Sequence, residues 1–244
     1  MTFASEVAVI TGAGSGIGRA LTAAVLREGG SVLAIDRRWD EDPPPDPKDG
    51  ELQRVTADVR DREALEAVRD RLDRDPTVLV NSAGIAGPED AFDGTNLDAW
   101  RETLDVNLWG AVVCTHVFLP RLIDGRSTIL NVVSHGGLYG VRHASAYASA
   151  KGGLIAFTLS LASELVDRGI TVNGFLPGPT ATAMPLSRRT PEELDALVDQ
   201  GVMATADEVA ESALAVISPD WRRVSGQIIG GRPFTPLSRD LGSE

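Results

Sequence analysis

Short, nearly continuous apolar runs alternate along the chain with longer stretches in which hydrophobic positions recur at a helical period. A continuous apolar run is typical of a parallel strand covered on both faces, whereas a 3.6-residue period is typical of an amphipathic helix. Strands are expected at 7–11, 31–36, 52–57, 78–81, 128–134 and 171–176, and helices at 17–28, 62–74, 97–122, 146–168, 191–200 and 206–217.

The regular alternation of strands and helices predicts linked βαβ units, whose right-handed crossovers build one sheet. We therefore expect an α/β protein in which residues 1–244 form a single-domain Rossmann fold, with a doubly wound, mostly parallel sheet of about seven strands flanked by helices on both faces. The proline-rich segment 39–50 breaks this rhythm. It is expected to form a surface loop, with a lip over a bound ligand as the alternative.

The composition is that of an ordinary soluble globular protein, with 24% charged and 43% hydrophobic residues. A net charge of −12 argues against binding to nucleic acid or anionic membranes, because both require a basic surface. No basic leader or long apolar run is visible, so a cytoplasmic location is expected. The single cysteine, Cys114, stands in an apolar stretch and is expected to be a buried thiol, with a catalytic nucleophile as the alternative.

Tyr147 and Lys151 lie one helical turn apart, in a chain with only two tyrosines and two lysines. This spacing places a phenol and an ammonium on the same face of a helix. A nearby ammonium favours the phenolate, so Lys151 is expected to lower the pKa of Tyr147. The pair is therefore a candidate acid/base for chemistry near neutral pH.

A glycine-rich turn at 11–18 joins the first strand to the first helix, as in a dinucleotide-binding βαβ unit. Asp36 ends the second strand about twenty residues later, where a carboxylate can accept hydrogen bonds from the adenosine ribose. It would repel a 2′-phosphate, which favours NAD, while Arg37 and Arg38 leave NADP open as the alternative. The expected cofactor contacts in the turn are Gly12, Ser15, Gly16, Ile17 and Gly18.

Together, the Gly12…Gly16…Gly18 spacing and the Tyr147…Lys151 pair resemble the short-chain dehydrogenase/reductase family, over about residues 5–231. In the turn that resembles the family's Asn-Asn-Ala-Gly sequence, Ser82 replaces the second asparagine. The resemblance implies further cofactor contacts at Asp58 and Val59 beside the adenine, at Asn81, Ala83 and Gly84 after the fourth strand, and at Pro177, Gly178, Thr180 and Thr182 after the sixth, in addition to Tyr147 and Lys151 themselves.

The chemistry and spacing suggest a hydride transfer in which Tyr147 is the acid/base and Lys151 supports it and holds the nicotinamide ribose. Ser134, thirteen residues before Tyr147, would donate to the substrate oxygen. The resemblance further implies that Asn107 positions a water that links Lys151 to solvent. No metal ligand is expected.

The predicted function is NAD(P)-dependent oxidation or reduction of a small secondary alcohol or ketone. Two alternatives stay open: an epimerase or dehydratase that recycles its cofactor, and a dinucleotide-binding sensor without catalysis. The sequence leaves the substrate and the physiological direction unassigned.

Specificity is expected just after Ser134, just after Gly84, and in a substrate lid at about 180–202. His135 and His143 are candidate substrate contacts, with ordinary loop hydrogen bonding as the alternative. The long helices at 97–122 and 146–168 are apolar on more than one face, and the resemblance implies a homotetramer built on them. The tail at 232–244 either covers a neighbouring subunit's site or is free.

Overall fold

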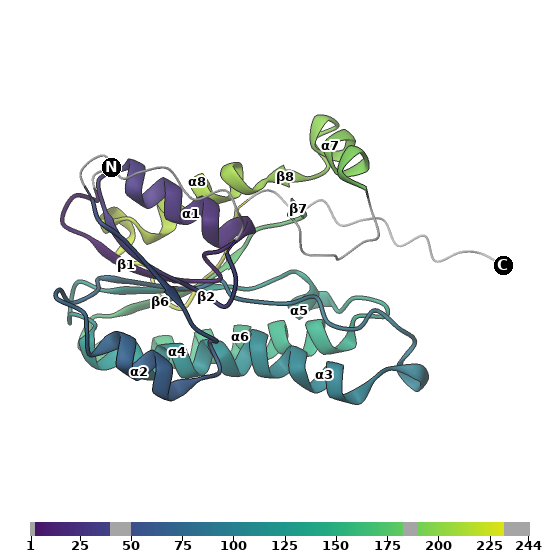
Figure 1. Cartoon of the computed structure of the whole chain (residues 1–244), viewed down its shortest axis with the longest axis horizontal. Helices are drawn as coiled ribbons and strands as arrows, with labels where there is room; N and C mark the ends of the chain where they lie inside the picture. Colours follow the sequence, from purple (N-terminus) through teal and green to yellow (C-terminus); the bar gives the residue numbers. More distant parts are fainter. Residues whose placement is uncertain (1–2, 40–49, 183–189, 232–244) are drawn as a thin grey trace.

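The structure, a computed structural model, describes residues 3–39, 50–182 and 190–231. Its centre is a seven-stranded, fully parallel sheet with the strand order β3-β2-β1-β4-β5-β6-β9, which confirms the predicted fold class (Figure 1). The strands are β1 Val7–Thr11, β2 Ser31–Asp36, β3 Leu52–Thr56, β4 Val78–Asn81, β5 Thr128–Val132, β6 Thr171–Leu176 and β9 Ile228–Gly230.

Helices cover both faces of the sheet (Figure 1). Alternate residues of β1 serve the two resulting cores: Ala8 and Ile10 pack in one, and Val9 packs in the other, as the continuous apolar run predicts. On one face lie α1 Gly16–Arg27 and α8 Ala206–Ile217, and on the other α2 Arg62–Arg69, α3 Leu97–Leu104, α4 Gly110–Phe118 and α6 Ser145–Glu164.

The strand order reverses at β1, which pairs with β2 on one side and with β4 on the other. In open α/β sheets, ligands bind beyond the carboxyl ends of the strands at this point. The segments that follow β1, β4 and β5 carry most of the predicted site residues, so the topology brings them to one edge of the sheet.

The predicted continuous helix at 97–122 is wrong in its middle and at its end. Residues Asp105–Trp109 form a π-helical segment between α3 and α4, and Leu119–Arg121 form a 3₁₀ turn. The side chain of Asn107, inside the π segment, bonds both the N–H and the C=O of Ile85 on a neighbouring loop. Tertiary contacts of this kind override a hydrophobic period.

The ends of the other predicted helices differ less from the observed ones. The helix predicted at 62–74 ends at Arg69, and the one predicted at 146–168 ends at Glu164 and is followed by a 3₁₀ turn, Val166–Arg168. The elements without a sequence prediction include α5 Gly136–Tyr139, the 3₁₀ turns Phe92–Gly94 and Pro219–Trp221, and three short strands: β7 Thr180–Ala181, β8 Ala204–Thr205 and β9.

The predicted lid at 180–202 contains α7 Pro191–Asp199. The strand pairing of β7 with β8 joins the first residues of the lid to the residues just after it. Lid closure itself stays a prediction. Within the described residues, no helix is long and apolar enough to cross a membrane. The predictions for the proline-rich loop at 40–49, for the lid residues 183–189 and for the tail at 232–244 lie outside the described residues.

Candidate active site

The glycine turn after β1 is packed against the turn after β4. Gly12 has a φ of +67°, and a Cβ there would lie 2.7 Å from the backbone of Ala83, so glycine is required. Thr11 Oγ1 accepts from the N–H groups of Ser82, at 3.2 Å, and Ala83, at 3.3 Å. The glycine turn and the turn after β4 are therefore in direct contact at Gly12 and Ala83.

Asp36 lies at the end of β2, beside the same turn. Its Oδ2 accepts from Gly14 N at 2.9 Å, and its Oδ1 accepts from Arg38 N at 3.0 Å. A carboxylate has about four lone-pair sites, so both oxygens keep the capacity to accept from ribose hydroxyls. Arg37 and Arg38 are exposed next to it. The carboxylate is thus oriented by backbone amides at the position where the sequence predicts the ribose contact.

The N-terminus of α1 provides an anion site of the kind a pyrophosphate requires. Ser15, its N-cap residue, is extended and makes no capping hydrogen bond through its side chain, so the first-turn amides of the helix are left for another acceptor. A Cβ on Gly16 would lie 3.3 Å from the methyl group of Thr182. The segment after β6 therefore reaches the glycine turn, and Ile17 of this turn is partly buried against the core.

Asp58 and Val59 have structural partners of their own. Asp58 accepts from the Arg60 guanidinium at 2.9 and 2.6 Å, and this hydrogen bonding holds the pKa of the carboxyl below its usual value. Val59 is buried against Gly110, where a Cβ would approach it to 2.5 Å. Its side chain belongs to the core, and its predicted contact with the adenine stays a prediction.

Ser134, Tyr147 and Lys151 meet at the carboxyl end of β5. Ser134 lies beside Tyr147, because a Cβ on Gly136 would be 3.5 Å from Ser134 Oγ and 3.6 Å from Tyr147 Cδ1. Lys151 Nζ donates to Val132 O at 2.7 Å and lies 5.9 Å from the centre of the Tyr147 ring. The 20-residue helix α6 carries both Tyr147 and Lys151, and both are buried. The structure thus brings three of the four predicted catalytic residues together.

The electrostatics of this trio differ from the sequence expectation. Burial raises the pKa of Tyr147, and its hydrogen bond with Ser134 offsets only part of that rise. Burial also lowers the pKa of Lys151 to about 8. The predicted net lowering of the Tyr147 pKa is therefore wrong in this structure, because desolvation of the phenolate outweighs a lysine that lies over the ring and is bonded to Val132.

Asn107, the fourth predicted catalytic residue, lies next to Lys151. A Cβ on Gly84 would be 3.2 Å from Asn107 Oδ1 and 3.8 Å from Lys151 Nζ, so all three residues converge. Asn107 Oδ1 accepts from Ile85 N at 2.7 Å, and its Nδ2 donates to Ile85 O at 2.8 Å. The amide thus holds the loop after β4 against the lysine, and its role in a water relay stays a prediction.

A buried polar network behind the site was missed at the sequence level. Asn81 Nδ2 donates to Asn131 Oδ1 at 2.8 Å and to Thr115 Oγ1 at 3.0 Å, while Asn131 Nδ2 donates to Thr158 Oγ1 at 2.9 Å. The Asn81 side chain therefore points into the core, where it links β4 and β5 to α4 and α6. The available signal was Asn131 itself, a polar residue inside an otherwise apolar run.

The segment after β6 is shaped by its own turn. Gly178 has a φ of +75°, and Thr180 Oγ1 donates to its carbonyl oxygen at 3.1 Å. Pro177 precedes this turn and is partly buried, as are Gly178 and Thr180. These residues lead into Thr182, which lies beside Gly16 of the glycine turn, and the nicotinamide contact of this segment stays a prediction.

The remaining candidate residues are Cys114, His135 and His143. Cys114 is fully buried, and burial raises the pKa of its thiol to about 12, as expected for a core thiol. His135 is partly buried, which lowers its pKa, and His143 is exposed with a φ of +63°. Within the described ranges, His, Cys, Asp and Glu side chains form no group of three that could hold a metal ion.

Comparison with known proteins places this geometry in a family. The model of the short chain dehydrogenase family matches residues 6–193. The chain is 35% identical to galactitol 2-dehydrogenase (L-tagatose-forming) of Cereibacter sphaeroides, over 91% of each protein. It is 32% identical to (3R)-3-hydroxyacyl-CoA dehydrogenase of Mus musculus, over 93% of this chain and 96% of the relative.

A solved structure supports the same assignment. The protein from Beutenbergia cavernae assigned as an NAD(P)-dependent gluconate 5-dehydrogenase, with NADP bound at low occupancy, superposes with a TM-score of 0.81. It is 32% identical to this chain, and the match covers 94% of this chain and 96% of that one. On the family model, the relatives and the fold, the chain belongs to the short-chain dehydrogenase family of oxidoreductases.

Proposed function

We propose that this protein transfers a hydride between a nicotinamide cofactor and a secondary alcohol or its ketone, with Tyr147 as the acid/base. The observation that carries the proposal is the grouping of three side chains at the end of β5: Tyr147 and Lys151 are buried on the same helix, and Ser134 lies beside Tyr147. The relatives are dehydrogenases by name, which supports the reaction class.

Several residues fit a dinucleotide. The open amides at the N-terminus of α1 suit a pyrophosphate, and the glycine turn that carries them packs directly against the backbone of Ala83. Asp36 would bind the adenosine ribose, and its charge favours NAD, with NADP second because Arg37 is adjacent. When bound, the nicotinamide supplies the hydride chemistry.

The protein's own part of the reaction is the movement of a proton. In reduction, the Tyr147 hydroxyl gives its proton to the substrate oxygen, and in oxidation the phenolate takes it back. Ser134 donates a hydrogen bond to the same oxygen as charge develops there. The raised pKa of Tyr147 keeps the proton in place at neutral pH, so we expect alcohol oxidation to accelerate as the pH rises.

Replacement of Tyr147 by phenylalanine tests the proposal. Tyr147→Phe removes only the hydroxyl, so turnover should fall by at least about 100-fold, while the affinity for NADH stays within a few-fold of wild type. Turnover is followed by nicotinamide absorbance with a panel of secondary alcohols and ketones, and binding by NADH fluorescence. If the variant keeps wild-type turnover on any substrate of the panel, Tyr147 is not the acid/base.

We also infer a homo-oligomer, with a tetramer as the expected size. The support is the exposure of Ala156 and Leu159 on α6, a helix that is buried on its other faces. The mass of the oligomer is measured by light scattering.

A cytoplasmic location stays a prediction of the sequence.

A further inference from the structure

The segment after Ser134 exposes apolar side chains beside the reacting groups. Leu138 is 47% exposed, Tyr139 67% and Val141 48%, all within four positions of the chain. Contiguous exposed apolar groups in a soluble protein mark a place that something apolar covers.

Val141 is the one of the three that reaches the reacting groups. A Cβ on Gly136 would lie 2.9 Å from Val141 Cγ2, 3.5 Å from Ser134 Oγ and 3.6 Å from Tyr147 Cδ1. One point in space is therefore bordered by a valine methyl group, the serine hydroxyl and the tyrosine ring. Because Gly136 has no side chain, the methyl group of Val141 takes the space next to the Ser134 hydroxyl and the Tyr147 ring.

The segment on the Lys151 side is apolar as well. Residues 84–88 read Gly-Ile-Ala-Gly-Pro, and Asn107 holds the Ile85 backbone in place beside Lys151. Neither 84–88 nor 136–141 contains a charged residue, and the only polar side chain in the two segments is the exposed phenol of Tyr139. Apart from Tyr139 and the neighbouring Ser134, His135 and Tyr147, the side chains on these flanks are therefore hydrocarbon, between glycines that have none.

We infer that the substrate is a secondary alcohol or ketone whose carbons next to the reacting carbon carry no hydroxyl groups, and that Val141 is a specificity-determining residue that contacts this hydrocarbon. The inference rests on the proposed function. Each hydroxyl of a polyol that is moved from water to the Val141 methyl group would lose hydrogen bonds without regaining them. A hydrocarbon substituent loses none and gains from leaving water.

Two matched pairs of alcohols test the substrate class with the full-length wild-type protein. 2-Hexanol is compared with mannitol, and cyclohexanol with myo-inositol, so that carbon number and ring are held constant and only the hydroxyl groups differ. We expect kcat/KM to be higher for the apolar member of each pair by at least about 100-fold. Turnover of mannitol or myo-inositol at equal or higher kcat/KM would overturn the inference.

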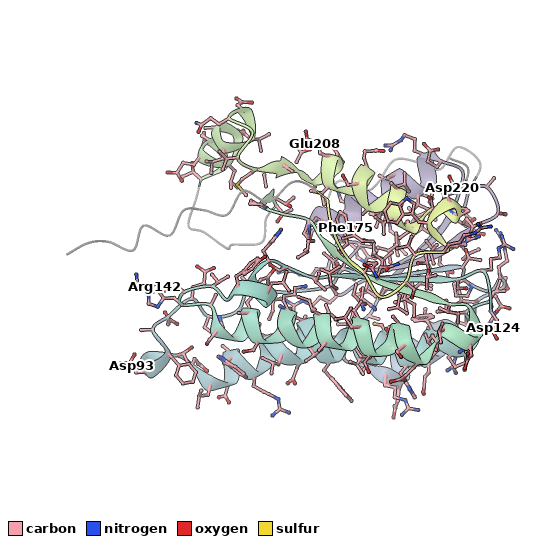
Figure 2. All side chains as sticks on the ribbon, turned by 180° about the vertical axis from the view of Figure 1, so that it is seen from behind. Asp93, Asp124, Arg142, Phe175, Glu208 and Asp220 are labelled. Atoms are coloured by element: carbon pink, nitrogen blue, oxygen red, sulfur yellow. The ribbon has the colours of Figure 1, made fainter. Side chains whose placement is uncertain are left out.

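Val141→Thr tests the residue, because threonine keeps the shape of valine and replaces one methyl group with a hydroxyl. We expect kcat/KM for 2-hexanol to fall about 10-fold, since the substrate would have to desolvate that hydroxyl. The matched control is Val166→Thr. Val166 is 67% exposed and follows the far end of α6, next to the Arg168–Asp124 ion pair. Figure 2 places Asp124 at the opposite end of the molecule from Arg142, the neighbour of Val141.

The control variant should behave as wild type, and equal effects of the two variants would remove Val141 from its role.

Failure of this inference differs from failure of the proposed function. If a polyol is the better substrate and Tyr147→Phe abolishes its oxidation, the reaction stands and only the apolar class is wrong. If no alcohol or ketone of either kind is turned over with NAD or NADP, the proposed function falls and this inference falls with it.

Discussion

Burial lowers the pKa of Lys151 from its ordinary value of 10.5 to about 8, while its Nζ keeps a hydrogen bond to Val132 O. The unfolded chain holds this proton more tightly than the folded protein does, so the charged lysine lowers stability below pH 8. That cost fades as the pH rises from 8 towards 10.5. A residue required for turnover is thus expected to weaken the fold.

Lys151→Met should therefore abolish turnover and raise the free energy of unfolding at pH 7, by on the order of 3 kcal/mol. Most of this gain should be gone at pH 10, where the lysine of the wild-type protein is neutral when folded. Urea unfolding of both proteins at the two pH values measures the difference. A variant that is less stable than wild type at pH 7 would contradict this account.

At the scale of single residues, the sequence predicted which side chains belong to the site better than it predicted their pKa values. The four-residue spacing of Tyr147 and Lys151 was sufficient to pair them, because helix geometry is local. The direction of the Tyr147 pKa was predicted wrongly, since it depends on burial by residues distant in sequence. Asn131 was missed for the same reason: its partners, Asn81 and Thr158, come from another strand and a helix.

Among the elements, the π-helical segment Asp105–Trp109 has the clearest link to the site. A π turn accommodates one residue more than an α turn, and such segments recur at functional sites. Here the extra residue leaves Asn107 inside the turn, with its amide on Ile85 and beside Lys151. A hydrophobic pattern does not reveal one extra residue, so the sequence predicted an uninterrupted helix.

Deletion of Trp109, which is 56% exposed, should let this segment become a regular α-helix and rotate Asn107 away from Ile85. We expect kcat to fall at least about 10-fold, with far-ultraviolet circular dichroism close to that of wild type. The control is Trp109→Ala, which keeps the chain length and should keep kcat. Equal losses of kcat in the two variants would show that the indole matters and the π geometry does not.

At the scale of the whole molecule, a cluster of ion pairs and a hydrogen bond around Glu6 links the amino ends of several strands, opposite the site. Glu6, which precedes β1 and is 2% exposed, accepts from Thr77 before β4 and pairs with Arg126 before β5 and Arg222 before β9. Burial raises the pKa of Glu6, but these hydrogen bonds and charges lower it overall. Its stabilisation is therefore present above pH 4.5 and is lost as the pH falls.

Arg222→Met should leave the buried Glu6 carboxylate with only Arg126 and Thr77 as partners. The loss of the Arg222 ion pair should cost roughly 3 kcal/mol of stability at pH 7. For a protein of this length, that corresponds to a fall in Tm of about 10 °C. The gap in Tm between variant and wild type should narrow below pH 4.5, and kcat at 25 °C should be unchanged because the cluster lies at the opposite end of the strands. Calorimetry and one activity assay measure both, and a loss of kcat in a folded variant would contradict the separation.

At this largest scale the sequence was most informative, because alternating strands and helices with right-handed crossovers admit few topologies. The short strands β7, β8 and β9 were not predicted, since strands of two or three residues carry no period. The same applies to α5, a single turn defined by its packing against α6.

The face of the sheet that carries α1 is completed only by α8, and Leu21 of one helix shares a core with Leu214 of the other. On the ribosome, α1 emerges early and must wait for nearly all of the remaining chain before its apolar side is covered. A messenger that is cut short before residue 206 would thus yield a product in which the part of this sheet face covered by α8 is exposed. Cellular quality control recognises such surfaces. Premature stop codons anywhere before α8 are therefore expected to behave genetically as complete loss of the protein.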